Sequence, residues 1–333
     1  MARMQLPRHV SFSAGGTKGL AFAGVLDALE DHIQAYCDTT YDEWRASLLG
    51  VAGCSAGSIA ALMLALGLDR NTRHQVLMQD LSDMRSIVRC PNVSLLFDRF
   101  GIEDGSALKQ VIQDVLMSGG MSGRSTLGDL KRLLRIDVVM VASNLNRGGP
   151  EFLSAATHPD MPVCDAVFAS CCVPFLFAPQ VWEDAYLVDG YLTCSLPQIF
   201  DEADTLFVKV PLDPVRKPAN WAEVIHRFFA CGNFGQQQGQ MELRDRAEWF
   251  LEIALMSNAS NLDHTLSKEQ VERYVFNGYV TVLDRLTGKR LLPTIHTVVL
   301  FYIQFAAACD PINARASVPS PEIESESEGD PDS

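Results

Sequence analysis

Residues 48–66 place a short apolar run, a glycine-flanked turn and an apolar helical stretch in immediate succession. Residues 48–52 predict a buried strand. Residues 58–66 consist almost entirely of Ala, Leu, Ile and Met, which predicts a helix buried on nearly all sides. Only residues 53–57 connect the two, so the chain must turn sharply there. A strand that turns at once into a buried helix is typical of an α/β domain.

Further strands and helices extend this pattern along the first two thirds of the chain. Residues 9–13 predict a strand that runs through a glycine turn into a helix over 20–29. The other predicted elements are strands over 136–142, 186–188 and 205–210, a short helix over 163–169, and helices joined by loops over 70–135. Because strand 136–142 is almost continuously apolar, we expect it to lie inside a parallel sheet.

The composition excludes several classes of protein. About 47% of the 333 residues are apolar, which excludes a mainly disordered chain, and the net charge of −14 provides no basic footprint for nucleic acid. Six acidic residues lie after Ser320, so the rest of the chain carries a charge of −8. The nine cysteines form no Cys-x-x-Cys pair, and the first residues lack the apolar stretch of a signal peptide. We therefore expect reduced thiols, a cytoplasmic setting and no metal site.

The turn at residues 53–57 has the form Gly-x-Ser-x-Gly, which is the sequence form of a nucleophile elbow. In such a turn Ser55 takes a strained conformation, and Gly53 and Gly57 are small enough to let the backbone fold tightly. The amide dipoles of the following helix favour negative charge at the turn. A glycine-rich junction that only packs tightly has the same form, so the turn alone leaves both interpretations open.

A second glycine turn, at residues 13–19, offers consecutive backbone amides at the start of a helix. Such amides donate hydrogen bonds to an anion, which here is either a phosphate or the oxyanion of an ester under cleavage. Ala14 breaks the dinucleotide-binding pattern, and Lys18 is followed by Gly19 rather than by the Ser or Thr of a Walker loop. Lys18 fits either a support for the loop or a solvated lysine at a helix start.

No histidine forms a convincing triad with Ser55 in the chain order of an α/β-hydrolase. The histidines after that serine are His74, His158, His226, His264 and His296. Only the last of them lies late beside a periodic segment, and that segment has the character of a hydrophobic tail. Asp189 with Gly190 closes a predicted strand, and Asp-Gly by itself most often marks a turn.

The glycine loop, the Gly53-Cys54-Ser55-Ala56-Gly57 turn and Asp189-Gly190 follow one another in the order found in the patatin-like phospholipase family. The chain resembles that family over about residues 9–215. Further similar segments are 142–146 with 152–154, the Ala-Ser-x-x-x-Pro stretch within 165–179, and Leu196-Pro197. The resemblance implies a three-layer α/β/α fold with a mostly parallel central sheet. It also implies that Ser55 is the nucleophile and Asp189 its proton acceptor.

The resemblance further implies a serine esterase that hydrolyses acyl esters of phospholipid, lysophospholipid or triacylglycerol at a membrane or droplet surface, without metal or cofactor. Gly15, Gly16 and Thr17 are then expected to contact the oxyanion. The supporting motif residues are Lys18, Gly19, Gly53, Gly57 and Gly190. Two alternatives stay open: an acyltransferase that uses the same acyl-serine, and a catalytically silent lipid-binding protein.

The chain departs from the family pattern at three places. Ala14 stands where the first loop glycine is usual, and Tyr191 replaces the small residue after Asp-Gly. Cys194 and Ser195 stand where asparagines are common. Of these departures, Tyr191 is the one expected to narrow the site.

Four segments are predicted along the chain. A lead over 1–8 precedes the patatin-like domain over 9–215, a helical extension covers 216–317, and an acidic disordered tail covers 318–333. Within the extension, residues 291–309 are apolar and nearly long enough to span a bilayer. They fit either a core helix that closes the domain or a membrane segment, so the protein is expected to be peripheral to membranes or inserted at its C-terminal end.

Overall fold

A computed structural model describes residues 6–287 except for 78–80, 83, 90, 212–220, 233, 254 and 256–265. All of them belong to one compact unit, residues 1–293. The apolar segment 291–309 and the acidic tail 318–333 lie outside the described residues. In the part of the chain that is described, no helix is long and apolar enough to cross a membrane.

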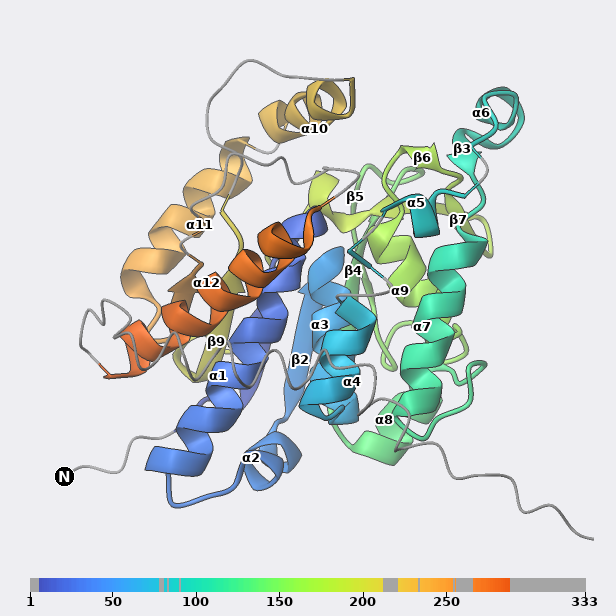
Figure 1. The fold of residues 1–333 in the computed structure, drawn as a ribbon. Coiled ribbons are helices and arrows are strands. Elements are labelled where there is room, and N and C mark those ends of the chain that lie inside the picture. The colour runs from blue at the N-terminus through green and yellow to red at the C-terminus, as the bar shows by residue number, and fades with distance from the viewer. Residues whose placement is uncertain are drawn as a thin grey trace, which may run out of the picture. The chain divides into compact units, whose positions relative to one another are not determined.

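Eight strands form the central sheet, in the order β10-β9-β1-β2-β4-β8-β7 with β5 beside β4 (Figure 1). The strands are β1 (His9–Phe12), β2 (Gly50–Cys54), β4 (Asp137–Asn144), β5 (Gly149–Leu153), β7 (Gln180–Trp182), β8 (Ala185–Asp189), β9 (Thr205–Lys209) and β10 (Phe250–Glu252). Neighbours from β10 to β4 are parallel, whereas β5, β7 and β8 pair in antiparallel fashion. The expectation of a mostly parallel central sheet is confirmed. A separate parallel pair joins β3 (Gly101–Glu103) to β6 (Phe175–Phe177).

Helices connect and cover these strands. They are α1 (Ala21–Tyr36), α2 (Tyr41–Ser47), α3 (Ala56–Leu66), α4 (Arg70–Gln75), α5 (Met84–Ile87), α6 (Leu95–Arg99), α7 (Ser106–Ser118), α8 (Leu127–Leu134), α9 (Val163–Cys171), α10 (Trp221–Gly232), α11 (Phe234–Arg246) and α12 (Lys268–Thr287). Short 3-10 helices η1 (Gly16–Leu20), η3 (Gly190–Leu192) and η4 (Glu202–Asp204) add single turns. The segment 216–317, predicted as helical, contains α10, α11 and α12, and also strand β10, which lies between α11 and α12 in the chain.

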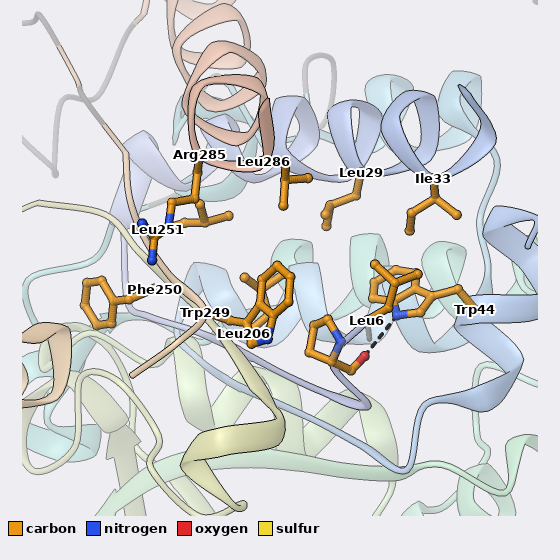
Figure 2. Close-up of a pocket in the computed structure, with 11 residues that line it drawn as sticks. Leu6, Leu29, Ile33, Trp44, Leu206, Trp249, Phe250, Leu251, Arg285 and Leu286 are labelled. Atoms are coloured by element: carbon orange, nitrogen blue, oxygen red, sulfur yellow. Dashed lines mark hydrogen bonds between the residues drawn. The ribbon is translucent and has the colours of Figure 1, made fainter. Parts of the chain in front are cut away.

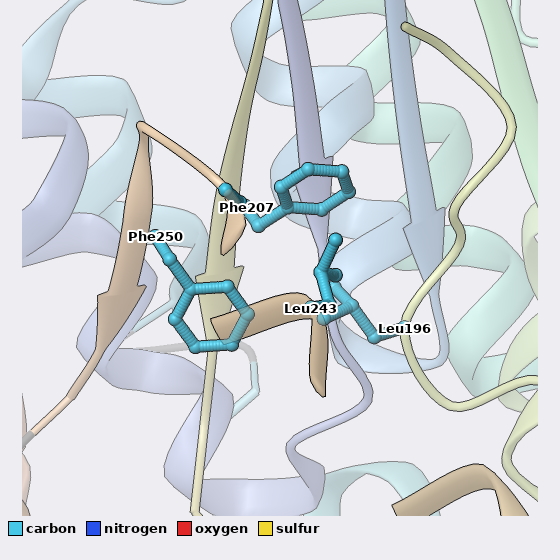
Figure 3. Close-up of a cluster of buried hydrophobic side chains, with 5 residues drawn as sticks. Leu196, Phe207, Leu243 and Phe250 are labelled. Atoms are coloured by element: carbon cyan, nitrogen blue, oxygen red, sulfur yellow. The ribbon is translucent and has the colours of Figure 1, made fainter. Parts of the chain in front are cut away.

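Alternate residues of β1 show that helices cover both faces of the sheet. Phe12 points to one face, where its ring lies 5.2 Å from that of Phe22 in α1. Ser11 points to the other face together with its register partner Phe207, which packs there against Leu243 of α11 (Figure 3). The sheet therefore lies between two helical layers, which confirms the three-layer α/β/α fold.

Helix α12 packs along α1 through close contacts that only glycine permits. A Cβ atom added at Gly278 of α12 would overlap the carbonyl oxygen of Ala21. In the same way, a Cβ atom at Gly24 of α1 would overlap the carbonyl oxygen of Val275. The two helix backbones therefore approach closely, and α12 forms part of the same packed core as the sheet.

Gly278→Ala is expected to lower the free energy of unfolding by about 1–3 kcal/mol, because α1 and α12 must separate to admit the methyl group. Urea unfolding measures the change. Gly239→Ala in α11 is the matched control, since nothing lies within 4 Å of its added Cβ. That variant should be neutral or slightly more stable than the parent. Equal stability of the two variants would contradict the close packing of the helices.

Candidate active site

The turn between β2 and α3 holds Ser55 in an unusual backbone conformation. Its φ of 52° and ψ of −126° lie in a region that non-glycine residues rarely adopt, at a cost of about 1–3 kcal/mol. The glycines on either side are required by space. A Cβ at Gly53 would overlap the carbonyl oxygen of Gly57, and a Cβ at Gly57 would overlap that of Ser13. The sharp, strained turn expected from the Gly-x-Ser-x-Gly pattern is present.

Two other serines fix this turn. The Ser55 N–H donates to Ser170 Oγ at 2.9 Å, and Ser170 Oγ donates in turn to the Val141 carbonyl of β4 at 2.6 Å. The Ser58 hydroxyl donates to the Ser55 carbonyl at 2.6 Å. Because both hydroxyls are fully buried, they hold the strained backbone without competition from water. Sequence analysis gave neither serine a role.

Strand β8 brings Asp189 to the hydroxyl of Ser55. The Ser55 hydroxyl donates to Asp189 Oδ2 at 2.7 Å, although 134 positions separate the two residues. The other carboxylate oxygen accepts the Tyr191 N–H at 2.8 Å. The Asp189 N–H donates to the Cys172 carbonyl at 2.8 Å, and the Ser143 hydroxyl donates to the Asp189 carbonyl at 2.9 Å. Each oxygen of the Asp189 carboxylate therefore accepts a hydrogen bond, which fixes its orientation.

Burial gives the Asp189 carboxyl an unusual affinity for protons. Asp189 is 4% exposed and Ser55 is 8% exposed. Burial raises the pKa of Asp189 from 3.8 to about 6, while the hydrogen bonds from Tyr191 and Ser55 act in the opposite direction. The carboxyl is therefore mostly ionised at neutral pH but is a stronger base than an exposed aspartate. A group of this kind can accept the proton of a hydroxyl that becomes a nucleophile.

The glycine loop lies against the residue that follows Ser55. A Cβ at Gly19 would come within 2.5 Å of the Ala56 Cβ. Gly16 has a φ of 53°, which glycine tolerates best. The N–H groups of Gly15 and Gly16 donate to no acceptor among the described residues, whereas the Lys18 N–H donates to the Gly15 carbonyl at 3.1 Å. An oxyanion role for Gly15, Gly16 and Thr17 stays a prediction.

Lys18 is not the solvated lysine that the sequence left as one alternative. Its residue is only 2% exposed and ranks among the largest fully buried side chains. Burial of a lysine is rare unless the charge is compensated. Lys18 therefore belongs to the interior beneath the loop. Gly190 is equally confined, because a Cβ there would overlap the Val141 carbonyl oxygen.

Helix α11 supports the glycine loop through a chain of hydrogen bonds that sequence analysis did not anticipate. The Ala14 N–H donates to the Ser195 carbonyl at 2.7 Å. Gln240 Nε2 of α11 donates to the Ser195 hydroxyl at 2.7 Å, and the Ser195 N–H donates to Gln236 Oε1 at 3.2 Å. Ala14 and Ser195, two departures from the family pattern, thus bind each other.

The histidines and cysteines of the described residues do not take part in the serine–aspartate pair. His74 Nε2 contacts the buried carboxylate of Asp27 at 2.5 Å, and no described histidine hydrogen-bonds to Ser55. Burial raises the pKa of the Cys54, Cys171 and Cys172 thiols. No cluster of three or more metal-ligating side chains occurs among the residues that the structure describes.

An apolar pocket lies away from this site, near the starts of the strands (Figure 2). Leu206 at the beginning of β9 and Pro7 before β1 line it, with Trp44 of α2 donating from Nε1 to the Pro7 carbonyl at 2.9 Å. Ser55 follows the last residue of β2 instead. Because ligands of parallel sheets bind at the carboxyl ends of the strands, the serine–aspartate pair is the better candidate site.

Comparisons with known proteins bear on the fold and the family. A family model described as patatin-like phospholipase matches residues 10–199, more than half of the chain. The uncharacterized protein YqhO of Bacillus subtilis is 31% identical over 205 residues, which cover 56% of this chain and 64% of YqhO. An uncharacterized protein of Acanthamoeba polyphaga mimivirus is 25% identical over 198 residues, 59% of this chain and 62% of the relative. The matched part therefore spans less than two thirds of either relative.

A solved structure is also similar in fold. The crystal structure of VipD from Legionella pneumophila superposes with a TM-score of 0.53 at 17% sequence identity. The match covers 85% of this chain and 67% of VipD. At this level of identity the likeness concerns the fold alone.

Proposed function

The chain belongs to the patatin-like phospholipase family, and from this premise we propose that it is a serine esterase that hydrolyses acyl ester bonds of lipids. Ser55 is the proposed nucleophile and Asp189 the proposed proton acceptor. The observation that carries the proposal is the 2.7 Å hydrogen bond from the Ser55 hydroxyl to the buried Asp189 carboxylate. Phospholipid, lysophospholipid and triacylglycerol are the proposed substrates.

The proposed reaction has two halves. In the first, Asp189 takes the proton of Ser55 Oγ while that oxygen attacks the ester carbonyl, and the proton then passes to the alcohol that leaves. In the second, water gives a proton to Asp189 and attacks the acyl-serine, and Asp189 then returns that proton to Ser55 Oγ as the fatty acid is released. The N–H groups of Gly15 and Gly16, with Thr17, are the proposed donors to the oxyanion, each worth about 3 kcal/mol in the barrier.

Product analysis with the purified chain tests the proposal. Phosphatidylcholine, its lysolipid and triacylglycerol are offered separately, with and without a glycerol acceptor. Release of free fatty acid regardless of acceptor is the expected result. Acyl transfer to glycerol in place of release would identify an acyltransferase instead. Absence of both, together with no labelling by a fluorophosphonate, would favour the silent lipid-binding protein.

The rate is expected to depend on pH through Asp189. Because only the ionised carboxylate accepts a proton and its pKa is about 6, kcat/KM should be level at neutral pH and fall as the pH drops below about 6. The limiting slope is about tenfold per pH unit. Initial rates with a water-soluble acyl ester measure the profile. A rate that stays level down to about pH 4, where an exposed aspartate titrates, would contradict the assigned role.

Gln240→Ala is expected to lower kcat by roughly tenfold with little change in KM, because Ser195 loses a support and the Ala14 end of the glycine loop shifts. The exposed Gln238 on the same helix provides the matched control, Gln238→Ala. Steady-state kinetics of both variants with a soluble ester measure the effect. If both variants keep the parent kcat, α11 does not position the loop.

A further inference from the structure

The single-turn helix η3 connects Asp189 to Thr193. At its start, the Asp189 carboxylate accepts the Tyr191 N–H at 2.8 Å. At its end, the Thr193 N–H donates to the Gly190 carbonyl at 3.0 Å. Because only three residues lie between the two ends, a displacement of Thr193 must also displace the Tyr191 amide. The orientation of the Asp189 carboxylate therefore depends on the position of Thr193.

A second connection between Asp189 and Thr193 runs through the hydroxyl of Ser143 in β4. Ser143 Oγ lies 2.8 Å from Thr193 Oγ1 and 2.9 Å from the Asp189 carbonyl oxygen. A carbonyl oxygen only accepts hydrogen bonds, and a serine hydroxyl carries a single proton. Ser143 therefore donates to Asp189 and accepts from Thr193. Because Ser143 is buried, water does not compete for this chain of hydrogen bonds, and each bond polarises the next.

Helix α11 anchors the backbone of Thr193. Gln236 Nε2 donates to the Thr193 carbonyl, and Gln236 Oε1 accepts the Ser195 N–H at 3.2 Å. One side-chain amide thus binds the chain at two positions, 193 and 195. Gln240 holds the Ser195 hydroxyl from the same helix, as described above. Helix α11 therefore contacts both halves of the proposed machinery, the aspartate through Thr193 and the glycine loop through Ser195.

We propose that Thr193 is a positioning residue for Asp189. Its hydroxyl, through Ser143, and its backbone, through η3, keep the Asp189 carboxylate directed at the Ser55 hydroxyl. This inference rests on the proposed function and adds the group that orients the proton acceptor. Thr193 acts through Asp189 and takes no part in the proton transfer itself.

Loss of this positioning should increase the affinity of Asp189 for protons. A hydrogen bond donated to a carboxylate lowers its pKa. Burial raises the pKa of Asp189 to about 6, and the hydrogen bonds from Tyr191 and Ser55 limit that rise. If the Tyr191 amide moves away, the pKa of Asp189 should therefore rise further. Three buried thiols also face this carboxyl and stay uncharged, because burial raises the pKa of each: Cys54, Cys171 and Cys172.

Thr193→Val in the full chain tests the role of the hydroxyl, because valine keeps the shape of the side chain. With a water-soluble acyl ester, kcat is expected to fall roughly tenfold with little change in KM. The midpoint of the acidic limb of kcat/KM is expected to rise by about one pH unit. Thr193→Ser restores a hydroxyl and should return both values toward those of the parent.

Thr205→Val is the matched control, because it also removes a threonine hydroxyl that hydrogen-bonds to a carbonyl. The Thr205 hydroxyl donates to the Asp201 carbonyl at 2.5 Å. Thr205 begins β9, whereas Ser55 follows the last residue of β2, at the opposite ends of the parallel strands. This variant should keep the parent kcat and the parent midpoint.

Two further variants test the route of the coupling. If the Thr193 hydroxyl acts through Ser143, the Thr193→Val, Ser143→Ala pair should lose about as much kcat as the more affected single variant. Losses that multiply would overturn this route. Gln236→Ala removes the anchor on α11 and should raise the midpoint in the same direction as Thr193→Val.

The outcomes separate this inference from the proposed function. An unchanged midpoint in both Thr193→Val and Gln236→Ala, with hydrolysis that still requires Ser55, would overturn only the positioning role. An equal shift in Thr205→Val would overturn it as well. Carbon-13 NMR titration of the Asp189 carboxyl, assigned by its absence in Asp189→Asn, measures the same midpoint without turnover. If the unaltered chain hydrolyses no ester, the proposed function fails, and the titration still decides whether Thr193 acts on Asp189.

Discussion

Replacing Ser55 with alanine is expected to lower kcat by roughly 10⁴- to 10⁶-fold, because the variant lacks the hydroxyl that the proposed mechanism acylates. The Ser55 hydroxyl is the group that hydrogen-bonds to the Asp189 carboxylate. Alanine removes the attacking oxygen but keeps the size of the turn small. Fatty-acid release and labelling by a fluorophosphonate should be lost together.

Ser122→Ala is a control for the chemistry of labelling. Ser122 is an exposed serine in the loop between α7 and α8, and its loss should leave both readouts at the parent level. Thermal unfolding of the Ser55→Ala protein should show that the fold persists. If that variant keeps more than about a tenth of the parent rate, the reaction belongs to another residue.

Asp189→Asn is expected to lower kcat by about 10⁴-fold, because an amide holds the hydroxyl in place but accepts no proton. The same change should not lower the free energy of unfolding at neutral pH. The pKa of Asp189 is raised from 3.8 to about 6. The contribution of the protonated carboxyl to the free energy of unfolding is therefore fully present below pH 3.8, and it is lost as the pH rises through about 6. This pKa shift corresponds to a cost of about 3 kcal/mol in folding free energy for the buried, ionised carboxylate. The uncharged asparagine does not carry that cost.

Urea unfolding of parent and variant at neutral and acidic pH measures this linkage. The advantage of Asp189→Asn should shrink as the pH falls below about 6. Asp129→Asn is a control of opposite sign. The hydrogen bond from the Thr126 N–H, the largest cause, lowers the pKa of Asp129, so its carboxylate stabilises the fold at neutral pH. A less stable Asp189→Asn protein at neutral pH, with the ordinary pH dependence of an exposed carboxyl, would contradict the burial argument.

Local patterns were sufficient to predict the elements that carry the site. The strand before Ser55, the helix after it and the strand that ends at Asp189 are each encoded by a contiguous run of residues. Their meeting in space was implied by the resemblance to a family and not by the residues themselves. A hydrogen bond across 134 positions leaves no periodic trace in a sequence.

The features that the sequence did not predict are very short strands and contacts between residues far apart in the chain. Strands β3, β6, β7 and β10 have three residues each, which is too few to show an alternating pattern. The roles of Ser170 and Gln240 depend on partners 115 and 45 positions away. Lys18 shows the same limit, since a lysine at a helix start has no local signal that it will be buried.

The position of β1 has a consequence for how the chain is made. It is synthesised before both β2 and β9, yet in the sheet it lies between them, and β9 begins only at Thr205. Until that later strand arrives, one side of β1 presents unpaired backbone groups, which invite association with other chains. Pairing across so many residues is also slow. Newly synthesised molecules should therefore depend on chaperones to shield this edge until translation is well advanced.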